Sequence, residues 1–441
     1  MSRVRRAIAS VAPLALGIAL ALLATGVSAQ ESQTSQGESS GASQDELSSL
    51  LVRAQSDIDN QDYAAAAEKY QNYLTQHPQD AQIHFQLGYC YTALQKADLA
   101  RSEYQKATEL NPKLAPAFLN LGLTELSTDP GAAAEAFQQA SELMPGQERP
   151  KLLLATALAH SGKPDQAIAQ YQAAEKISPN DSQLHRDFGA TLLNANRLTD
   201  AEQELRAAIT LDSQDTAANL MLSQCLLAEK KYDDATAQLD LYLKSRPDDE
   251  NARLTLVSAL ISAAKYDDAL AELGRASQAA QQSLPSLKLR FDALAGAKRY
   301  DAALATLTQA AALAPQEVDI PTKMARLYLE RKDYADAAKQ FLAALKIDPQ
   351  NTAALAGLVS AEYSGNDYKD ALKTIDLLSQ REPLSAQTLF VRADCYDKLG
   401  NKLEAADAYD KFLAANTDRN SDMYFAASER LRVLRRELGK R

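Results

Sequence analysis

The chain has 441 residues, a formal net charge of −11 at pH 7 and no tryptophan. Alanine and leucine, which favour helices, dominate its apolar content, whereas 16 glycines and 15 prolines are too few for an all-β or fibrous protein. The overall negative charge would repel a polyanion, which argues against nucleic acid as a partner.

The first 29 residues have the composition of a signal peptide. Three early arginines precede an apolar stretch over residues 7–24, and small residues up to Ala29 have the spacing that a signal peptidase accepts. We expect cleavage after Ala29 and secretion across an inner membrane into a periplasm. The alternative is an uncleaved N-terminal anchor, because the apolar stretch is just long enough to span a bilayer. In that case the membrane would be contacted only through this segment.

Residues 30–46 follow, and up to residue 44 they read QESQTSQGESSGASQ. They contain no large apolar side chain, so they cannot bury enough surface to offset the entropy of ordering. We therefore predict a disordered tether over residues 30–46. Ser43 and Glu46 have the spacing of a capping box, which indicates that a helix starts here.

A 34-residue repeat covers most of the remaining chain. Phrases such as KKYDDA, AKYDDA, KRYDAA, KDYADA and NDYKDA recur so that their tyrosines, from Tyr232 onward, are 34 residues apart. Eleven units tile residues 47–419, with a one-residue deletion near Pro130 in the third. They begin at residues 47, 81, 115, 148, 182, 216, 250, 284, 318, 352 and 386.

The residues of these units resemble the tetratricopeptide repeat. The second unit carries the family's signature at Leu87, Gly88, Tyr91, Ala100, Tyr104, Ala107 and Pro112. The resemblance implies an all-α, right-handed superhelical solenoid of about eleven helix-turn-helix repeats. Each unit is too thin to hide its own apolar face, so neighbouring units must share it.

Small residues recur at two positions where the helices of a unit must approach closely. The eighth position holds Gly88, Gly122, Ala155, Gly189 and Ser223. The twentieth position holds Ala66, Ala100, Ala133, Ala167, Ala201, Ala235, Ala269, Ala303, Ala337, Ala371 and Ala405. In the third unit, which lacks one residue, Ala133 is the equivalent of the twentieth residue. We predict that all of them are buried between helices.

Residues 420–441 are predicted to form a C-terminal capping helix. Ala427, Leu431, Leu434 and Leu438 lie on one helical face, and arginines lie on the other. The basic face either remains solvated or binds anionic lipid or a partner.

No constellation of catalytic or cofactor-binding residues emerges from the sequence. Cys90, Cys225 and Cys395 share the tenth position of units four and five repeats apart, too distant for a disulfide, so we expect small buried side chains. The four histidines have no partner at a metal-ligand spacing, and phosphate-loop and nucleophile motifs are absent. We therefore predict no catalytic residue, no cofactor and no metal.

The resemblance implies a binding groove along the first helices, at positions that include the fifth and ninth of each unit. Its apolar part suits an amphipathic helix or an extended peptide, and Phe85 with Tyr89 is its strongest candidate pair. The predicted groove residues are Phe85, Tyr89, Leu119, Leu123, Leu152, Thr156, Arg186, Leu220, Gln224, Leu254, Ser258, Lys288, Asp292 and Arg326. For any single leucine, packing against the next first helix is an equal alternative.

These observations favour a non-catalytic scaffold of the cell envelope that binds peptide or helical segments of other proteins. The alternative is a structural component of an outer-membrane export or surface-polysaccharide machine. An enzyme is disfavoured, because signal, tether and repeats leave no room for a catalytic domain.

Overall fold

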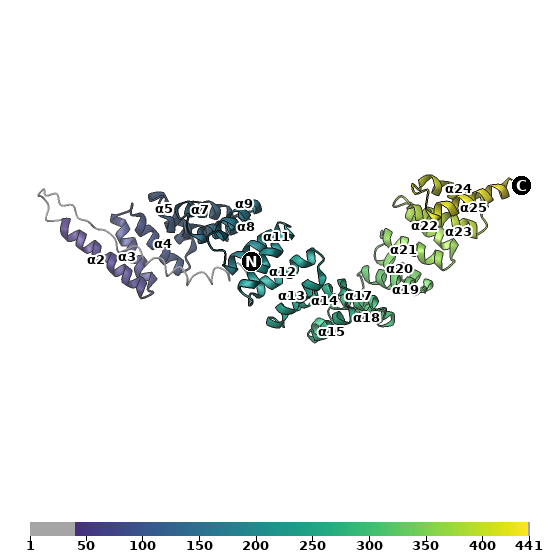
Figure 1. Cartoon of the computed structure of the whole chain (residues 1–441), viewed down its shortest axis with the longest axis horizontal. Coiled ribbons are helices and arrows are strands. Elements are labelled where there is room, and N and C mark those ends of the chain that lie inside the picture. The colour runs from purple at the N-terminus through teal and green to yellow at the C-terminus, as the bar shows by residue number, and fades with distance from the viewer. Residues whose placement is uncertain (1–39, 440–441) are drawn as a thin grey trace. The chain divides into compact units, whose positions relative to one another are not determined.

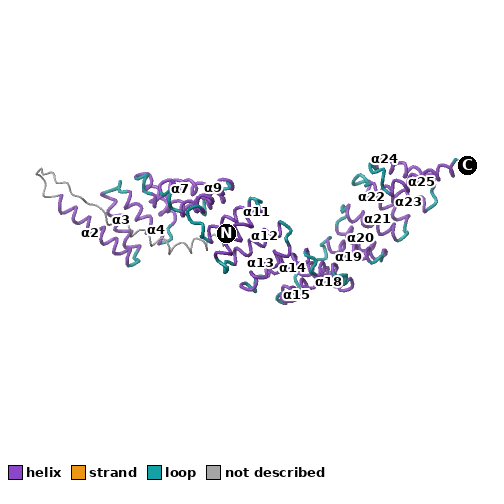
Figure 2. Tube along the Cα trace, in the orientation of Figure 1, coloured by secondary structure: helices purple, strands orange, loops and turns teal. Residues whose placement is uncertain are grey.

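A computed structural model describes residues 40–439 of the chain (Figure 1). This described part contains 24 α-helices and no strand, as the secondary-structure colours of Figure 2 show. The all-α repeat class predicted from the composition and the 34-residue period is confirmed. The predicted signal peptide of residues 1–29 lies outside the described residues.

The helices fall into two compact blocks, an N-terminal block that ends at Glu229 and a C-terminal block that begins at Lys230. The N-terminal block contains α2 (Ser40–Asp59), α3 (Tyr63–Gln76), α4 (Ala81–Ala93), α5 (Ala97–Leu110), α6 (Ala115–Glu125), α7 (Pro130–Leu143), α8 (Glu148–His160), α9 (Pro164–Glu175), α10 (Ser182–Asn194), α11 (Leu198–Leu211) and α12 (Thr216–Ala228).

The C-terminal block contains α13 (Tyr232–Ser245), α14 (Glu250–Ser262), α15 (Tyr266–Arg275), α16 (Gln278–Gln281), α17 (Leu284–Gly296), α18 (Tyr300–Leu313), α19 (Asp319–Glu330), α20 (Tyr334–Ile347), α21 (Thr352–Ser364), α22 (Tyr368–Ser379), α23 (Ala386–Lys398), α24 (Lys402–Ala415) and α25 (Asp422–Leu438). First and second helices of the repeats alternate along both blocks, and α16 and α25 are additional.

The N-terminal boundary of the array differs from the prediction. Helix α2 begins at Ser40, so the capping-box pair Ser43 and Glu46 lies inside the helix and does not start it. Residues 40–46 lack large apolar side chains, and for that reason their composition predicts a tether. They continue the helix that Leu50 and Leu51 anchor, since extending an existing helix costs far less than nucleating one.

The close approach of paired helices depends on the predicted small residues. All eleven alanines at the twentieth position have 0% exposure, which confirms that prediction. At the eighth position, a Cβ placed on Gly88 would come within 2.8 Å of the Tyr104 ring, and one on Gly122 within 2.6 Å of the Phe137 ring. Absence of a side chain on the first helix therefore makes room for a buried aromatic ring on the second.

The turn between paired helices has a feature that the sequence analysis missed. In ten repeats the fifteenth residue adopts a positive φ of 58–79°. In nine of these turns, all except the one at Lys230, the next N–H is seen to bond to a carbonyl five residues earlier, which is a Schellman motif. In the third repeat the deletion removes this residue. The ten residues are Gln61, Gln95, Gly162, Asn196, Lys230, Ala264, Lys298, Lys332, Asn366 and Gly400.

Repeats are joined by a second kind of turn, in which proline and an acidic cap cooperate. Pro78 follows the end of α3, and two residues later the Asp80 carboxylate accepts hydrogen bonds from Gln82 N and Ile83 N at the start of α4. The same arrangement recurs where Pro179 precedes Asp181. Proline thus ends one repeat, and the cap starts the next.

The C-terminal helix covers the last repeat as its apolar pattern predicted. Ala427, Leu431 and Leu434 of α25 are buried in a cluster with Tyr409 and Phe412 of α24. No helix among residues 40–439 combines the length and apolarity needed to cross a membrane.

The left-handed turn residues generate a stability prediction. Ala264 is exposed and has φ 58°, a conformation that costs an L-residue about 1–2 kcal/mol and costs glycine little. Because glycine also loses about 0.5–1 kcal/mol of backbone entropy on folding, Ala264→Gly should stabilise the protein by up to about 1 kcal/mol. Thermal unfolding measures the change.

The matched control is Ala263→Gly, one residue earlier, where φ is −81° and alanine is unstrained. This variant should lower the melting temperature. An equal effect of the two substitutions would contradict the Schellman assignment of the turn.

Candidate functional site

The strongest predicted groove pair packs mainly within the protein. Phe85 is 9% exposed and lies against Tyr104 of α5, with 5.9 Å between the ring centroids. Tyr89 is half-buried and meets Tyr63 of α3 edge to face at 6.1 Å. Phe85 therefore belongs to the core that holds α4 on α5, and truncating it would reduce stability whether or not a partner binds there.

The other predicted groove residues differ in how much surface they offer. Gln224, Ser258 and Arg326 are exposed. The remainder are half-buried, namely Leu119, Leu123, Leu152, Thr156, Arg186, Leu220, Leu254, Lys288 and Asp292. Their role in binding remains a prediction, since half-burial fits both packing against the next helix and contact with a partner.

Three charged members of this set, Arg186, Lys288 and Asp292, are already paired. Lys288 Nζ lies 2.8 Å from Glu317, and Lys323 Nζ lies 2.9 Å from Asp292. In the N-terminal block Arg186 bonds to Asp215 at 2.9 Å. The pair of Lys323 and Asp292 joins successive repeats, whereas Arg186 and Lys288 each bond to the last residue of their own unit, just before the next repeat begins.

A cleft of about 890 Å³ opens in the N-terminal block beside the second helices α5, α7 and α9. The large apolar side chains of its lining come from the first helices α6 and α8, and its glutamines come from the second helices. The apolar residues include Phe118, Leu121, Leu154 and Leu158, and the glutamines are Gln105, Gln138, Gln139, Gln166 and Gln170.

The sequence of α7 explains why space is left here. This helix begins PGAAAEAF, and its small residues Gly131, Ala132, Ala134 and Ala136 line the cleft. A helix that carries so little side-chain volume cannot fill the gaps beside its neighbours. In the sequence this stretch stands out only as the site of the deletion, because the depth of a cleft depends on side chains from five helices.

One acidic side chain in the cleft is unusual. Glu125 is 8% exposed, and its carboxylate has no hydrogen bond or ion pair within residues 40–439. Burial raises the pKa of Glu125 above its usual value, although the nearby charge of Arg101 opposes this. Because this carboxylate is largely shielded from water, a donor supplied by a ligand can stabilise its charged form.

A polar lock recurs three times at the fourth position of a first helix. His84 Nδ1 lies 2.5 Å from a Glu103 carboxylate oxygen, and its Nε2 lies 3.0 Å from the Pro78 carbonyl oxygen. In each lock the basic residue joins its own second helix to the proline that ends the preceding repeat. The locks are His84 with Glu103 and Pro78, His185 with Glu204 and Pro179, and Arg253 with Glu272 and Pro247.

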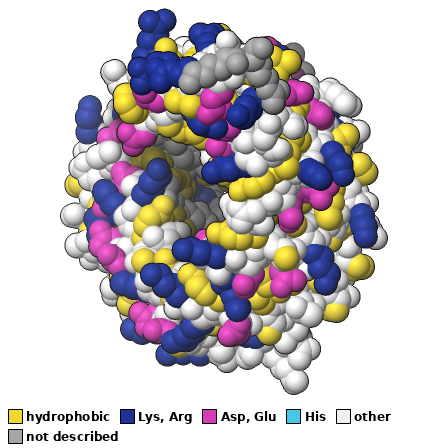
Figure 3. Space-filling model, turned by 90° about the vertical axis from the view of Figure 1, so that its right-hand side faces the viewer, with side chains coloured by type: hydrophobic (Ala, Val, Ile, Leu, Met, Phe, Trp, Pro, Cys, Tyr) yellow, Lys and Arg dark blue, Asp and Glu magenta, His cyan; other side chains and the backbone are white. Residues whose placement is uncertain are grey.

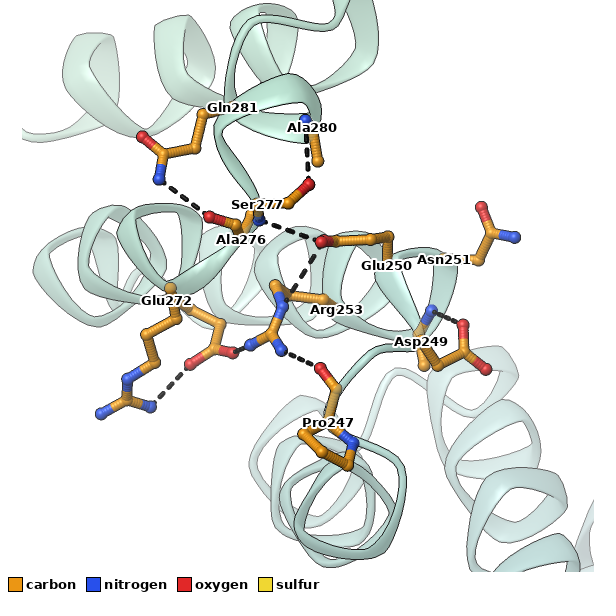
Figure 4. Close-up of polar contacts among 12 residues, drawn as sticks. Pro247, Asp249, Glu250, Asn251, Arg253, Glu272, Ala276, Ser277, Ala280 and Gln281 are labelled. Atoms are coloured by element: carbon orange, nitrogen blue, oxygen red, sulfur yellow. Dashed lines mark hydrogen bonds and ion pairs between the residues drawn. The ribbon is translucent and has the colours of Figure 1, made fainter.

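Figure 4 shows the arginine version of this lock. The Arg253 guanidinium lies between the Glu272 carboxylate and the Pro247 carbonyl, and both charged side chains are buried. Glu250 lies 3.6 Å from Arg253 and also accepts a hydrogen bond from Ser277 N. Arginine can serve two acceptors at any physiological pH.

The second helix of this repeat is broken. Helix α15 ends at Arg275, and the short α16 follows before α17. Gln281 occupies the position where other repeats have the terminal proline, and its Nε2 donates to the carbonyls of Gly274 and Ala276. The side-chain amide thus closes the extra turn seen in Figure 4.

Two hydrogen bonds favour the positively charged form of His185. Nε2 donates to the Pro179 carbonyl (3.0 Å), and Nδ1 shares a proton with a Glu204 carboxylate oxygen (2.7 Å). Burial opposes this charge, but the two hydrogen bonds and the charges of Glu204 and Glu175 outweigh it. The pKa of His185 therefore lies above its usual value.

The three cysteines are buried, as predicted, and no disulfide joins them to one another. Burial raises the pKa values of Cys90 and Cys395 to about 12, so both remain thiols at neutral pH and are poor nucleophiles.

The basic face of α25 is largely neutralised. Arg430 bonds to Asp397 and Arg435 to Asp410. Arg432 bonds to Glu429 within the helix. Basic and acidic side chains are also interspersed on the face of the molecule drawn in Figure 3. The ion pairs of Arg430, Arg432 and Arg435 favour the alternative in which the basic face of α25 remains solvated.

The His185 lock predicts a pH dependence of stability. Because the folded-state pKa exceeds the unfolded value of about 6.5, the lock contributes fully below that pH and is lost as pH rises through the folded-state pKa. In metal-free buffer the melting temperature should fall as the pH rises above about 6.5. His185→Arg should flatten this fall, because arginine keeps both donors. An identical pH profile for the two proteins would contradict the lock.

Family models match nearly the whole chain. The model of the cilia and flagella-associated protein 70 C-terminal domain matches residues 1–253. Two tetratricopeptide repeat models match residues 294–344 and 328–389, and residues 386–419.

Individual relatives are more distant. A CTR9 homologue from Arabidopsis thaliana is 39% identical over 83 residues, which are 18% of this chain and 8% of that protein. The chain thus matches less than a tenth of the length of that relative.

Solved structures with a similar course of the chain include the tetratricopeptide repeat protein YrrB, described as having an unusual peptide-binding site. It is 21% identical, and the match covers 42% of this chain and 96% of YrrB with a TM-score of 0.38. Yeast Tom70 is 13% identical, and its match covers 90% of this chain and 96% of Tom70 with a TM-score of 0.36. One family model covers more than half of the chain, and repeat models cover much of the remainder. The chain therefore belongs to the tetratricopeptide repeat family, and its residues 1–253 belong to the family of the cilia and flagella-associated protein 70 C-terminal domain.

Proposed function

We propose that this protein is an interaction scaffold that holds an extended segment of a partner protein in the cleft beside α5, α7 and α9. The observation that carries the proposal is the cleft itself, which combines an apolar lining, glutamine amides and the unpaired carboxylate of Glu125. Its volume of about 890 Å³ is in the range of about 300–1,000 Å³ typical of ligand sites.

The chemistry of the lining favours a peptide. Each glutamine amide can both donate and accept, which matches the alternating N–H and C=O groups of an extended main chain. Phe118 and Leu158 offer an apolar surface for side chains of the segment. Glu125 offers an acceptor for a lysine, an arginine or a main-chain N–H.

The same lining favours binding over catalysis. Its titratable residues are Glu125, Glu135 and Lys163, and it contains no histidine, cysteine, serine or threonine. A covalent reaction would lack a nucleophile with an adjacent base.

The cellular place of the scaffold is part of the proposal. The arginines and apolar stretch of residues 1–29 support export to the cell envelope, with the repeats acting in the periplasm. A scaffold there would meet partners in an oxidising compartment, where three buried cysteines that do not pair with one another cause no wrong disulfide.

The cleft is tested by blocking it without disturbing the core. Ala169 is exposed and lines the cleft, so Ala169→Arg should fill it and weaken peptide binding about tenfold or more. A photo-crosslinker at Gln139 identifies the bound segment, and calorimetry with that segment as a synthetic peptide gives the dissociation constant. Ala64→Arg on α3 is the control, since Ala64 is exposed outside the cleft. Equal affinity of both variants would refute this site.

Export predicts a defined N-terminus. The protein recovered from the envelope fraction should begin at Gln30, which intact-mass measurement detects directly. Protein that keeps residues 1–29 and sediments with membranes would establish the anchored alternative, and full-length protein in the cytosol would contradict both.

A further inference from the structure

The histidine lock between the fourth and fifth repeats contains an additional carboxylate. Glu175 at the end of α9 joins His185 of α10 and Glu204 of α11, and ligand atoms of the three side chains lie within 4.8 Å of one another. Within residues 40–439 this is the one group of three such side chains that converges in this way.

The other two locks lack the third ligand, because its position is apolar. Ten residues before His185 stands Glu175, whereas Leu74 stands ten residues before His84 and Leu243 ten residues before Arg253. Structural locking therefore works without this carboxylate. Its presence also places a second negative charge beside Glu204, and the pKa of Glu204 is raised by burial and by the charge of Glu175.

We infer that Glu175, His185 and Glu204 form a divalent-metal site of the zinc class that ties the fourth repeat to the fifth. The Pro179 carbonyl accepts the Nε2 proton of His185 and would hold the tautomer in which Nδ1 has a free lone pair. Such an outer hydrogen bond is the usual support of a metal-bound histidine. One imidazole and two carboxylates, with water completing a tetrahedron, suit Zn²⁺.

The present spacing requires only a small adjustment. Zinc bonds of about 2.0–2.1 Å in a tetrahedron place ligand atoms about 3.4 Å apart. Nδ1 of His185 and Oε2 of Glu204 are now 2.7 Å apart around a shared proton. A carboxylate oxygen of Glu175 lies within 4.8 Å of the ligand atoms of both residues. Binding would release the Nδ1 proton, so the apparent affinity should rise with pH below the pKa of His185.

The experiment uses untagged, chelator-treated full-length protein. Calorimetry with ZnCl₂ at neutral pH should give one site per chain, and Co²⁺ in its place should give the absorbance of a tetrahedral complex. Glu175→Leu introduces the residue type of the other two locks, so it should fold with normal helicity and lose the site. No zinc binding by the wild type, or wild-type affinity in Glu175→Leu, would overturn the inference.

A gain-of-site variant sharpens the test. Leu74→Glu places the same triad at His84 and Glu103, so a folded Leu74→Glu protein should bind a second zinc. The double variant Leu74→Glu with Glu175→Leu should bind one. Failure of folded Leu74→Glu protein to gain a site would contradict the claim that the third carboxylate decides metal binding. This inference does not depend on peptide binding in the cleft.

Discussion

The close contact between the two helices of a repeat is the constraint on which the rest of the structure depends. Alanine at the twentieth position has no exposed surface in any repeat, and a glycine such as Gly88 or Gly122 leaves room for an aromatic ring opposite. Larger side chains would separate the helices and expose the apolar rows on which the next repeat packs. Because each repeat buries its neighbour's surface, this contact is needed along the whole array.

Polar contacts complete this packing by providing partners for helix ends and buried polar groups. The acidic caps, the left-handed turn residues and the three locks satisfy helix ends and buried groups that apolar packing alone would leave unpaired. His84, His185 and Arg253 occupy the same position in their repeats, so an imidazole and a guanidinium can make the same pair of contacts. The repeat therefore tolerates variation wherever the geometry of the hydrogen bonds is preserved.

The two candidate binding sites, the cleft and the metal site, lie where single repeats depart from the common sequence pattern. The alanine-rich α7 coincides with the cleft, and Glu175 adds a ligand atom where the other locks have leucine. Phe85 shows the opposite case, because a position expected to face a partner is used by the core. A common repeat supplies the scaffold, and single substitutions on it supply the chemistry.

The sequence by itself determined the all-α class, the repeat family and the buried small positions. A 34-residue period with alanine at the twentieth position admits only helix pairs that pack closely. Tertiary structure alone decided the cleft, the partners of the histidines and the burial of Phe85. Those properties depend on side chains from different helices, such as Glu175, His185 and Glu204, whose spacing along the chain matches no local motif. Local periodicity governs which residues form a helix, whereas the distances between helices depend on every side chain packed among them.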